Sequence, residues 1–206
     1  MKEYHKIQSL FKRDEKTHKF IVGEYSLPEL YYLRDNEWTM TEKIDGTNIR
    51  IGWIPEVGKK VGGRTDNAQT PTFLLDKLQY LFPDKLLSDV FPSTEVSLYG
   101  EGYGAKIQKG GGNYIPDGCD FILFDVMIGG WWLERENVED IARKLHINVV
   151  PIIMRGTIHD AIMAIHGGVG STFGDFLAEG MVLKPTTELF TRNGKRIVTK
   201  IKHRDF

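Results

Sequence analysis

Lys43 lies one residue before an Asp-Gly turn, where it could act as a nucleophile. From Trp38 to Ile44, apolar or acidic residues alternate with two threonines and Lys43, as a pleated strand requires. Asp45 and Gly46 then predict a tight hairpin, because glycine accepts positive φ and the next alternating segment starts at Asn48. A lysine held at a strand end can attack an electrophile once it has lost a proton. On this segment alone, an exposed lysine on a hairpin is the competing interpretation, because a KxDG string also arises by chance.

Two clusters of basic residues lie in a chain whose formal net charge is only −1. That balance argues against nucleic-acid binding through bulk positive charge, so such a role would need a local cluster. We interpret the N-terminal cluster as a solvated surface. In the C-terminal cluster, Ile197 and Ile201 interleave with Lys200 and Lys202, so a strand would project both lysines from one face and suggest a phosphate site. The two clusters are Lys12, Arg13, Lys16 and Lys19, and Lys195, Arg196, Lys200, Lys202, His203 and Arg204.

Three further segments carry residues that could take part in chemistry. Glu101 lies among glycines that permit close backbone approach by a ligand, although a solvated glutamate in a loop is the alternative. Phe124 lies in an apolar strand and could present its ring to a purine base, although core packing is the more common role of such a ring. Glu179 and Lys184 stand five residues apart, on opposite faces of any regular strand, so only a site near the strand's edge would use both.

The elements that would position these residues are short strands and a few helices, which predict an α+β fold. Apolar side chains at helical spacing follow Pro71 and recur from Val138 to Leu145, and each stripe predicts a helix. Thr157 and Asp160 resemble a weak capping box for a third helix, which would end at Gly167. Strands joined by hairpin turns favour a largely antiparallel sheet over a doubly wound one. The expected strands lie near residues 38–44, 48–54, 95–100, 120–127, 149–154, 180–184 and 196–202.

Bulk composition is that of an ordinary globular protein. The chain has 206 residues, of which 41% are hydrophobic and 27% charged, and we expect one domain with a substantial core. No apolar run approaches the ~18 residues of a membrane span, and the N-terminus does not resemble a secretory signal. The single cysteine, Cys119, excludes an intrachain disulfide framework. We therefore expect a cytoplasmic or other reducing intracellular compartment, with which a viral origin is compatible.

The order and spacing of the motifs resemble the covalent nucleotidyltransferases, which comprise ATP-dependent DNA and RNA ligases and GTP-using mRNA capping enzymes. The chain is most similar to the RNA ligase 2 family, from about Trp38 to Phe206. The closer match rests on EKIDGTN around Lys43, AKIQK after the Gly-rich loop, the LKP ending, and RNGKR before KIK. The resemblance implies a single ATP-grasp-like adenylation domain over residues 1–206, built on antiparallel sheets. The motifs, in order, are KxDG, Arg64 in GGRT, Glu101, Phe124-Asp125, EGMVLKP, and Lys200 with Lys202.

The resemblance also implies a role for each matching residue. Lys43 should attack the α-phosphate of ATP and carry AMP as a phosphoramidate. For that attack its pKa must be lowered from ~10.4 by nearby cations, for which Lys184, Lys200, Lys202 and a metal ion are candidates. Lys200 and Lys202 would contact the α-phosphate, and Glu179 would help to hold Mg²⁺ or Mn²⁺, which suit oxygen ligands. The remaining implied contacts are Glu101 to the ribose or metal, Phe124 to the adenine face, Glu42 to the adenine edge, Arg64 to ribose and phosphate, Asn48 and Lys184 to the nucleotide, and Asp45 within its own turn.

Sealing would require a bound nucleic acid, for which nicked or paired RNA is the expected partner. The sequence ends four residues after Lys202, whereas relatives usually continue into an OB-fold or a helical domain. A minimal ligase and one that needs a partner protein are both open. The alternatives are a nucleotide- or RNA-binding module without full sealing activity, and a minimal ATP-dependent DNA ligase. The candidate phosphate contacts, each weighed against a solvated surface role, are Lys106, Lys109, Arg192, Lys195 and Arg204.

Overall fold

A computed structural model describes residues 1–206 and divides the chain into two compact units. Unit 1 comprises Met1–His5 and Asp45–Val150, and unit 2 comprises Lys6–Ile44 and Pro151–Phe206. None of the helices has the length and apolar character needed to cross a membrane. The expectation that residues 1–206 form a single nucleotidyltransferase domain stays a prediction.

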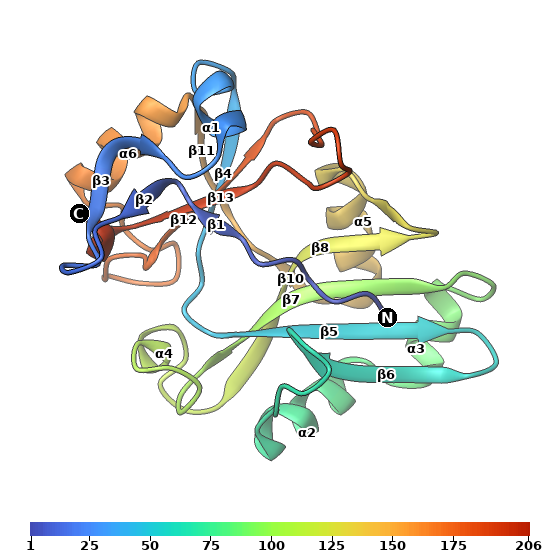
Figure 1. Ribbon diagram of the computed structural model, residues 1–206. Coiled ribbons are helices and arrows are strands. Elements are labelled where there is room, and N and C mark those ends of the chain that lie inside the picture. The colour runs from blue at the N-terminus through green and yellow to red at the C-terminus, as the bar shows by residue number, and fades with distance from the viewer. The chain divides into compact units, whose positions relative to one another are not determined.

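Unit 2 is built on a five-stranded sheet whose strands are antiparallel except where β1 runs parallel to β13 (Figure 1). The sheet order is β1 (Gln8–Ser9), β13 (Thr199–Lys202), β12 (Gly180–Pro185), β4 (Trp38–Glu42) and β11 (Ile152–Gly156). Strand alternation turns Trp38 and Met40 to one face, where they are fully buried. Thr39, Thr41 and the lysines of β13 therefore belong to the opposite face.

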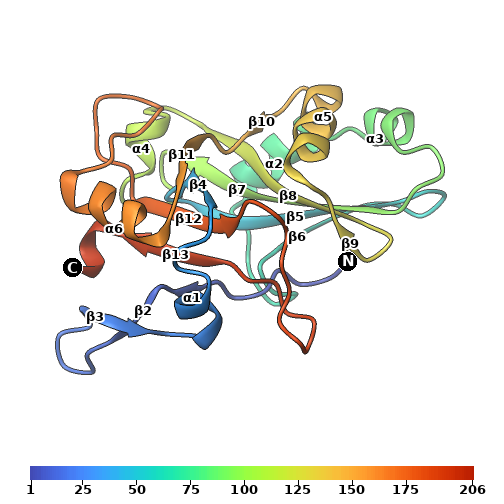
Figure 2. The ribbon, with the colours of Figure 1, turned by 90° about the horizontal axis from the view of Figure 1, so that it is seen from above.

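Helices and a small hairpin supply the rest of the unit 2 core. Helix α6 (Ile158–Gly167) begins at the capping box expected at Thr157, whose side chain accepts a hydrogen bond from the backbone N–H of Asp160. The hairpin of β2 (Phe11–Arg13) and β3 (Phe20–Tyr25) lies beside α1 (Pro28–Tyr32) (Figure 2). The Tyr25 and Tyr31 rings meet between them at 5.7 Å. A 3₁₀ turn, η1 (His203–Asp205), follows β13.

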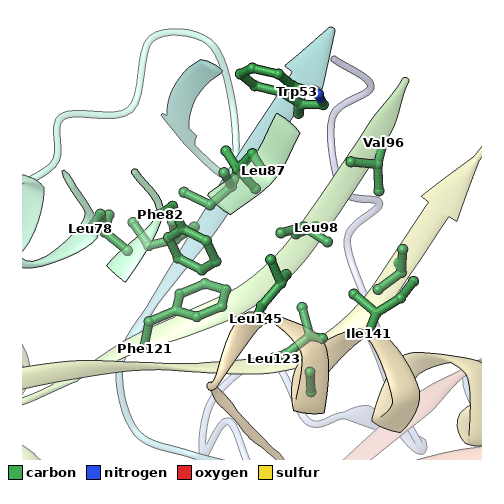
Figure 3. Close-up of a cluster of buried hydrophobic side chains, with 14 of the residues drawn as sticks. Trp53, Leu78, Phe82, Leu87, Val96, Leu98, Phe121, Leu123, Ile141 and Leu145 are labelled. Atoms are coloured by element: carbon green, nitrogen blue, oxygen red, sulfur yellow. The ribbon is translucent and has the colours of Figure 1, made fainter. Parts of the chain in front are cut away.

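Unit 1 contains the larger sheet, with helices α2, α3 and α5 packed through their apolar faces. Figure 3 shows Leu98 of β7 and Phe121 and Leu123 of β8 packed near Phe82, the residue after α2, and Leu145, the last residue of α5. Burial of these side chains supplies the main stabilising term. The strands, in sheet order, are β10 (Asn148–Val149), β8 (Cys119–Ile128), β7 (Val96–Gly104), β5 (Thr47–Ile54) and β6 (Gly58–Gly63), with β9 (Trp131–Trp132) on β8; the helices are α2 (Thr72–Leu81), α3 (Asp84–Val90), α4 (Gly111–Tyr114) and α5 (Arg135–Leu145).

The glycines around Glu101 make room for the core. A Cβ at Gly100 would lie 2.1 Å from Cζ of Phe121, and one at Gly102 would lie 2.6 Å from Cδ2 of Leu74. These distances are far below van der Waals contact, so any side chain would push the core apart. The glycines predicted to admit a ligand are thus accounted for by core packing.

Two strand predictions are wrong. The segments before and after Asp45-Gly46 form no hairpin, because β4 pairs with β11 and β12 whereas β5 pairs with β6 and β7. The strand expected at 149–154 is divided into β10 and β11, which belong to different sheets. In both cases long-range pairing, which buries apolar side chains in two separate cores, outweighs the local turn signal. The three predicted helices are present, while β1, β2, β3, β6, β9, α1, α3 and α4 had not been expected.

Candidate active site

The site in unit 2 begins where β4 ends. The backbone N–H of Lys43 donates to the carbonyl of Gly180 at 3.0 Å, which fixes the residue beside the start of β12. Alternation places Lys43 on the face of Thr39 and Thr41, as the sequence predicts. Its side chain is about one-fifth exposed. Lys43 is therefore held by a strand end and remains open to a ligand.

Glu179 joins two of the predicted lysines. One oxygen of its carboxylate accepts from Lys43 Nζ and the other accepts from Lys202 Nζ. The guanidinium of Arg204 lies 3.9 Å from the same carboxylate and is largely exposed. Glu179 precedes the first residue of β12, so strand alternation does not dictate its direction. The carboxylate therefore sits among three cations, of which Arg204 is the most accessible.

Lys200 completes the cluster from β13. Within this strand Lys200 and Lys202 lie two residues apart, and Lys200 is opposite Val182 whereas Lys202 is opposite Gly180. Both lysines thus belong to one face, as the sequence predicts. Burial, and then the positive charges of Lys202 and Lys43, lower the pKa of Lys200 to about 8. Part of the Lys200 population is therefore neutral at mildly alkaline pH.

The charge of Glu179 is maintained by its neighbours. Burial alone would raise the pKa of its carboxyl, but the charge of Lys43 and the hydrogen bonds from Lys202 and Lys43 hold this pKa below its usual range. Glu179 is accordingly ionised at neutral pH. A carboxylate fixed between ammonium groups is suited to exchange a lysine for a metal ion or to orient both lysines.

Glu42 turns away from this cluster, because it lies on the apolar face of β4 and is only 1% exposed. Its oxygens accept hydrogen bonds from Ser171 Oγ at 2.6 Å, from the Thr172 backbone N–H at 2.9 Å and from Thr172 Oγ1 at 2.8 Å. Three donors compensate the buried carboxylate. Ser171 and Thr172 were not predicted. The only sequence signal was an acidic residue at an apolar position of a strand, which demands a polar partner from elsewhere.

The other candidates in unit 2 lie in β12 and in the loop before β13. Lys184 lies opposite Thr39 in the register of β12 and β4, and it is partly buried. Arg192 and Lys195 are exposed in the loop before β13. Arg192 lines a hollow of about 430 Å³ together with Glu29, Thr191 and Asn193. These positions leave Arg192 and Lys195 accessible to a large ligand.

The candidates in unit 1 lie on the strands of its sheet. Asn48 of β5 is directly opposite Glu101 of β7, so their side chains lie on the same face. The Asn48 side-chain oxygen is buried and accepts no hydrogen bond. Arg64 follows β6 and is exposed. The Phe124 ring is partly buried and meets the Tyr4 ring edge-on at 5.0 Å.

The Asp45 turn is closed by the loop that carries two candidate RNA contacts. The backbone N–H of Asp45 donates to the Tyr114 hydroxyl at 3.3 Å, and the Gln108 side chain donates to the Gly46 carbonyl at 3.2 Å. Lys106 and Lys109 are exposed in this loop. The loop thus buttresses the turn and presents both lysines to solvent.

A family model described as RNA ligase matches residues 36–202, which is most of the chain and includes the cluster around Glu179. The chain belongs to the RNA ligase family. This agrees with the resemblance read from its motifs, and the mixed fold with antiparallel sheets is that of the family.

Solved structures with the same fold include an RNA ligase from Naegleria gruberi with pyrophosphate, at 20% identity and a TM-score of 0.66 over 86% of this chain and 52% of that one. A lysine-to-alanine mutant of that ligase with ATP and manganese matches at 19% identity and a TM-score of 0.66, covering 87% and 54% of the two chains. Another such mutant with ATP and manganese matches at 18% identity and a TM-score of 0.66, covering 98% and 58%. The chain spans just over half the length of these ligases.

In this RNA ligase fold, a divalent metal ion would need oxygen ligands from a bound nucleotide as well as from the protein. The chain has no group of three or more His, Cys, Asp or Glu side chains that could hold a metal ion. Mg²⁺ is often held by one or two carboxylates, with substrate phosphates and water completing its shell. Glu179, ionised and partly buried, can supply one such carboxylate once it releases a lysine. The donor set therefore fits a metal that arrives with a nucleotide.

Proposed function

We propose that this chain is an ATP-dependent RNA ligase that forms a covalent lysyl-AMP at Lys43, transfers AMP to a 5′-phosphate and seals it to a 3′-hydroxyl. One observation carries the proposal: Lys43 and Lys202 meet on the Glu179 carboxylate, with Lys200 close enough for their charges to lower its pKa. This group of cations around one carboxylate suits a triphosphate, whose charge exceeds that of a single acid. Membership of the RNA ligase family supports the assignment of the reaction class.

In the first step Lys43 is the nucleophile. An ammonium has no lone pair, so Lys43 must leave its ion pair with Glu179 and lose a proton to solvent. The bond from Nζ to the α-phosphorus then forms as the bond from that phosphorus to the bridging oxygen breaks. Pyrophosphate leaves with the electron pair, and AMP stays on Lys43.

Lys200 and Lys202 offset the negative charge that builds on the phosphate. Both project from one face of β13, and Lys202 is fixed by its bond to Glu179. Prepositioned cations need no reorganisation during the reaction, which makes them effective in stabilising the transition state. When bound through Glu179 and the phosphates, Mg²⁺ or Mn²⁺ would add Lewis-acid polarisation of the phosphoryl oxygens.

The nucleoside contacts are proposed for the residues that match the family's motifs. Phe124 would stack on adenine, and Asn48, Arg64 and Glu101 would contact the sugar and phosphate. The unpaired side-chain oxygen of Asn48 supports a role in accepting a hydrogen bond from the ligand. Glu42 is proposed to act at the adenine edge, although in the structure its carboxylate is occupied by Ser171 and Thr172. Lys184 would support the phosphates from the lysine face of the sheet.

The later steps would require a nucleic acid with adjoining 5′-phosphate and 3′-hydroxyl ends. The exposed side chains of Lys106, Lys109, Arg192, Lys195 and Arg204 are proposed to contact its phosphates. A partner protein is proposed to assist if the chain alone seals poorly.

Self-adenylylation tests the first step directly. Incubation with α-³²P-ATP and Mg²⁺ should label the protein, and EDTA should prevent labelling. Lys43→Ala should abolish the label. Lys85→Ala, which removes an exposed lysine of α3, should label like the wild type. Absence of label on folded wild-type protein would refute the proposal, and binding of ATP without label would favour the alternative of a nucleotide-binding module.

Sealing is tested with nicked duplexes that differ only in the sugars flanking the nick. We expect the all-RNA nick to be joined, and a pre-adenylylated 5′ end to be joined without ATP. Equal sealing of an all-DNA nick would instead favour a DNA ligase. Joining of the pre-adenylylated nick by Lys43→Ala would separate the last step from the first.

A further inference from the structure

We infer that the N-terminal β2–β3 hairpin positions the strand that carries Lys200 and Lys202, with Arg13 as the positioning residue. The inference rests on the proposed function, because it assigns Arg13 a role in the alignment of Lys202. The sequence interpretation of Lys12, Arg13, Lys16 and Lys19 as a solvated surface is thereby replaced for two members, Arg13 and Lys19.

The guanidinium of Arg13 is fixed by its own hairpin and by Ser9 of β1. Nη1 donates to the His18 carbonyl at 2.8 Å, and Nη2 donates to Ser9 Oγ at 3.2 Å. The group also lies 4.9 Å from the centre of the Phe20 ring, within the range of a cation–π contact. A planar guanidinium held from three sides presents its remaining donors in one defined direction.

That direction leads to Asp205, which is only 1% exposed. Nη2 of Arg13 lies 2.7 Å from Asp205 Oδ1. The other oxygen, Oδ2, accepts from the backbone N–H of Lys202 at 3.2 Å. One buried carboxylate thus links Arg13 to the main chain of Lys202. Removing one partner from a buried ion pair leaves an uncompensated charge. We therefore expect loss of the Arg13 guanidinium to loosen the Asp205 carboxylate and the Lys202 main chain bound to it.

A shift of the Lys202 backbone would reach the site directly. Lys202 is the last residue of β13, opposite Gly180, and its ammonium donates to Glu179. Lys43 donates to the same carboxylate and also binds the Gly180 carbonyl through its backbone. The path from Arg13 to Lys43 therefore contains Asp205, Lys202 and Glu179, with a hydrogen bond at each link.

The hairpin holds the C-terminal segment at further points. Lys19 Nζ donates to the carbonyls of Arg204, at 3.0 Å, and Phe206. The Phe20 and Phe206 rings meet edge-on at 5.4 Å. The backbone N–H of Leu10 donates to the Lys200 carbonyl at 3.0 Å. These contacts act on both sides of Lys202, so the hairpin constrains the strand end rather than a single atom.

The neighbouring pair of Lys12 with Glu24 provides a matched control. It also lies in the hairpin, but its atoms are 3.4 Å apart and both side chains are more than half exposed. An exposed pair of this kind contributes little to stability. Lys12→Ala should therefore leave the strand that carries Lys202 unchanged, whereas Arg13→Ala should disturb it.

Single-turnover labelling with α-³²P-ATP separates positioning from folding. The final extent of labelling reports the fraction of folded, competent protein, and the rate constant at saturating ATP reports alignment. We expect Arg13→Ala to lower the rate constant by roughly 10- to 100-fold while the final extent stays close to that of the wild type. Arg13→Lys, which keeps the charge, should recover part of the rate, and Lys12→Ala should match the wild type. A wild-type rate constant in folded Arg13→Ala would overturn the inference.

Backbone hydrogen exchange gives a readout that does not depend on catalysis. The amide of Lys202 is the donor to Asp205, so Arg13→Ala should make exchange in residues 199–206 faster than in the wild type and in Lys12→Ala. If the wild type failed to label, the proposed function would fail, and exchange alone would decide the structural part of the inference. Unchanged exchange of the Lys202 amide in Arg13→Ala would then overturn it.

Discussion

The ammonium of Lys43 pairs with the carboxylate of Glu179, 136 positions further along the chain. The second oxygen of that carboxylate is bound by Lys202. In this arrangement the proposed nucleophile is held in place but in its charged form. The Glu179 carboxylate must therefore release Lys43 before Lys43 can react.

Glu179→Gln should reduce self-adenylylation. The amide keeps the size of the side chain but removes the negative charge that lies among the cations and could bind a divalent metal. Because loss of a metal-supporting group typically weakens binding 10- to 100-fold, the Mn²⁺ concentration for half-maximal labelling should rise by roughly that factor. Labelling of Glu179→Gln and of the wild type across a Mn²⁺ titration measures this concentration.

The opposite result is also informative. If Glu179 served only to hold Lys43 in an ion pair, its replacement would free the amine and speed labelling, and it would leave the Mn²⁺ dependence unchanged. Faster labelling with an unaltered metal titration would therefore contradict a metal-holding role. Lys85→Ala is the control for handling and folding. Lys85 is exposed on α3 and is distant in the sequence from Glu179.

Lys200 should make labelling sensitive to alkaline pH. Burial and the charges of Lys202 and Lys43 lower its pKa to about 8, so the ammonium is present below this pH and is lost as the pH rises through it. The charged form is the one that attracts a triphosphate. The pH dependence of kcat/KM for ATP reports the free enzyme, and it should decline above a pH of about 8.

Lys200→Arg distinguishes this cause from others. A guanidinium stays protonated across the accessible pH range, so the alkaline decline of kcat/KM should move to higher pH even if the overall rate falls. The same alkaline limb in Lys200→Arg and wild type would show that another group controls it. Circular dichroism over the same pH range checks that neither protein unfolds.

Ser171 and Thr172 should contribute to stability through Glu42. Thr172→Val removes a hydroxyl that donates to a carboxylate only 1% exposed, and a buried acceptor that loses a donor costs about 1–3 kcal/mol. Urea denaturation should show this loss. Thr187→Val, at an exposed threonine of the same unit, should change stability by less than about 0.5 kcal/mol. Equal stability of the two variants would rule out a stabilising role for this contact.

Gly180→Ala should disturb both the sheet and the site. A Cβ at this position would lie 2.1 Å from the Ile201 carbonyl oxygen and 2.7 Å from Cα of Lys202, which are backbone atoms. The two strands must separate beside Lys202, so we expect a loss of about 1–3 kcal/mol and slower labelling. Thermal unfolding and single-turnover labelling measure these effects.

Gly170→Ala is the matched glycine variant. It lies in the loop that leads to Glu179, and a Cβ there would meet no heavy atom within 4 Å. Wild-type stability and labelling are expected. If Gly180→Ala behaved like Gly170→Ala, the close approach of β12 and β13 at Lys202 would not matter for the site.

The face of each strand was predictable because alternation is a local property with a period of two. It placed Lys43 beside Thr39 and Thr41, and Lys200 beside Lys202, before any fold was known. The third helix was predictable for a similar reason, since Thr157 and Asp160 satisfy each other within one turn. By contrast, the prediction of a hairpin at Asp45-Gly46 was wrong, because burial of apolar side chains in the two cores determines which strands pair.

The sequence by itself determined the set of chemically capable residues, their order, and the resemblance to RNA ligases that the family match supports. Only the tertiary structure decided which of them meet. It brought Glu179 between Lys43 and Lys202, gave the buried Glu42 its partners Ser171 and Thr172, and linked Arg13 to Lys202 through Asp205. The physical reason is that periodicity acts between neighbours in the chain. A buried carboxylate instead takes its donors from whichever distant segments the packing of the core brings within hydrogen-bonding reach.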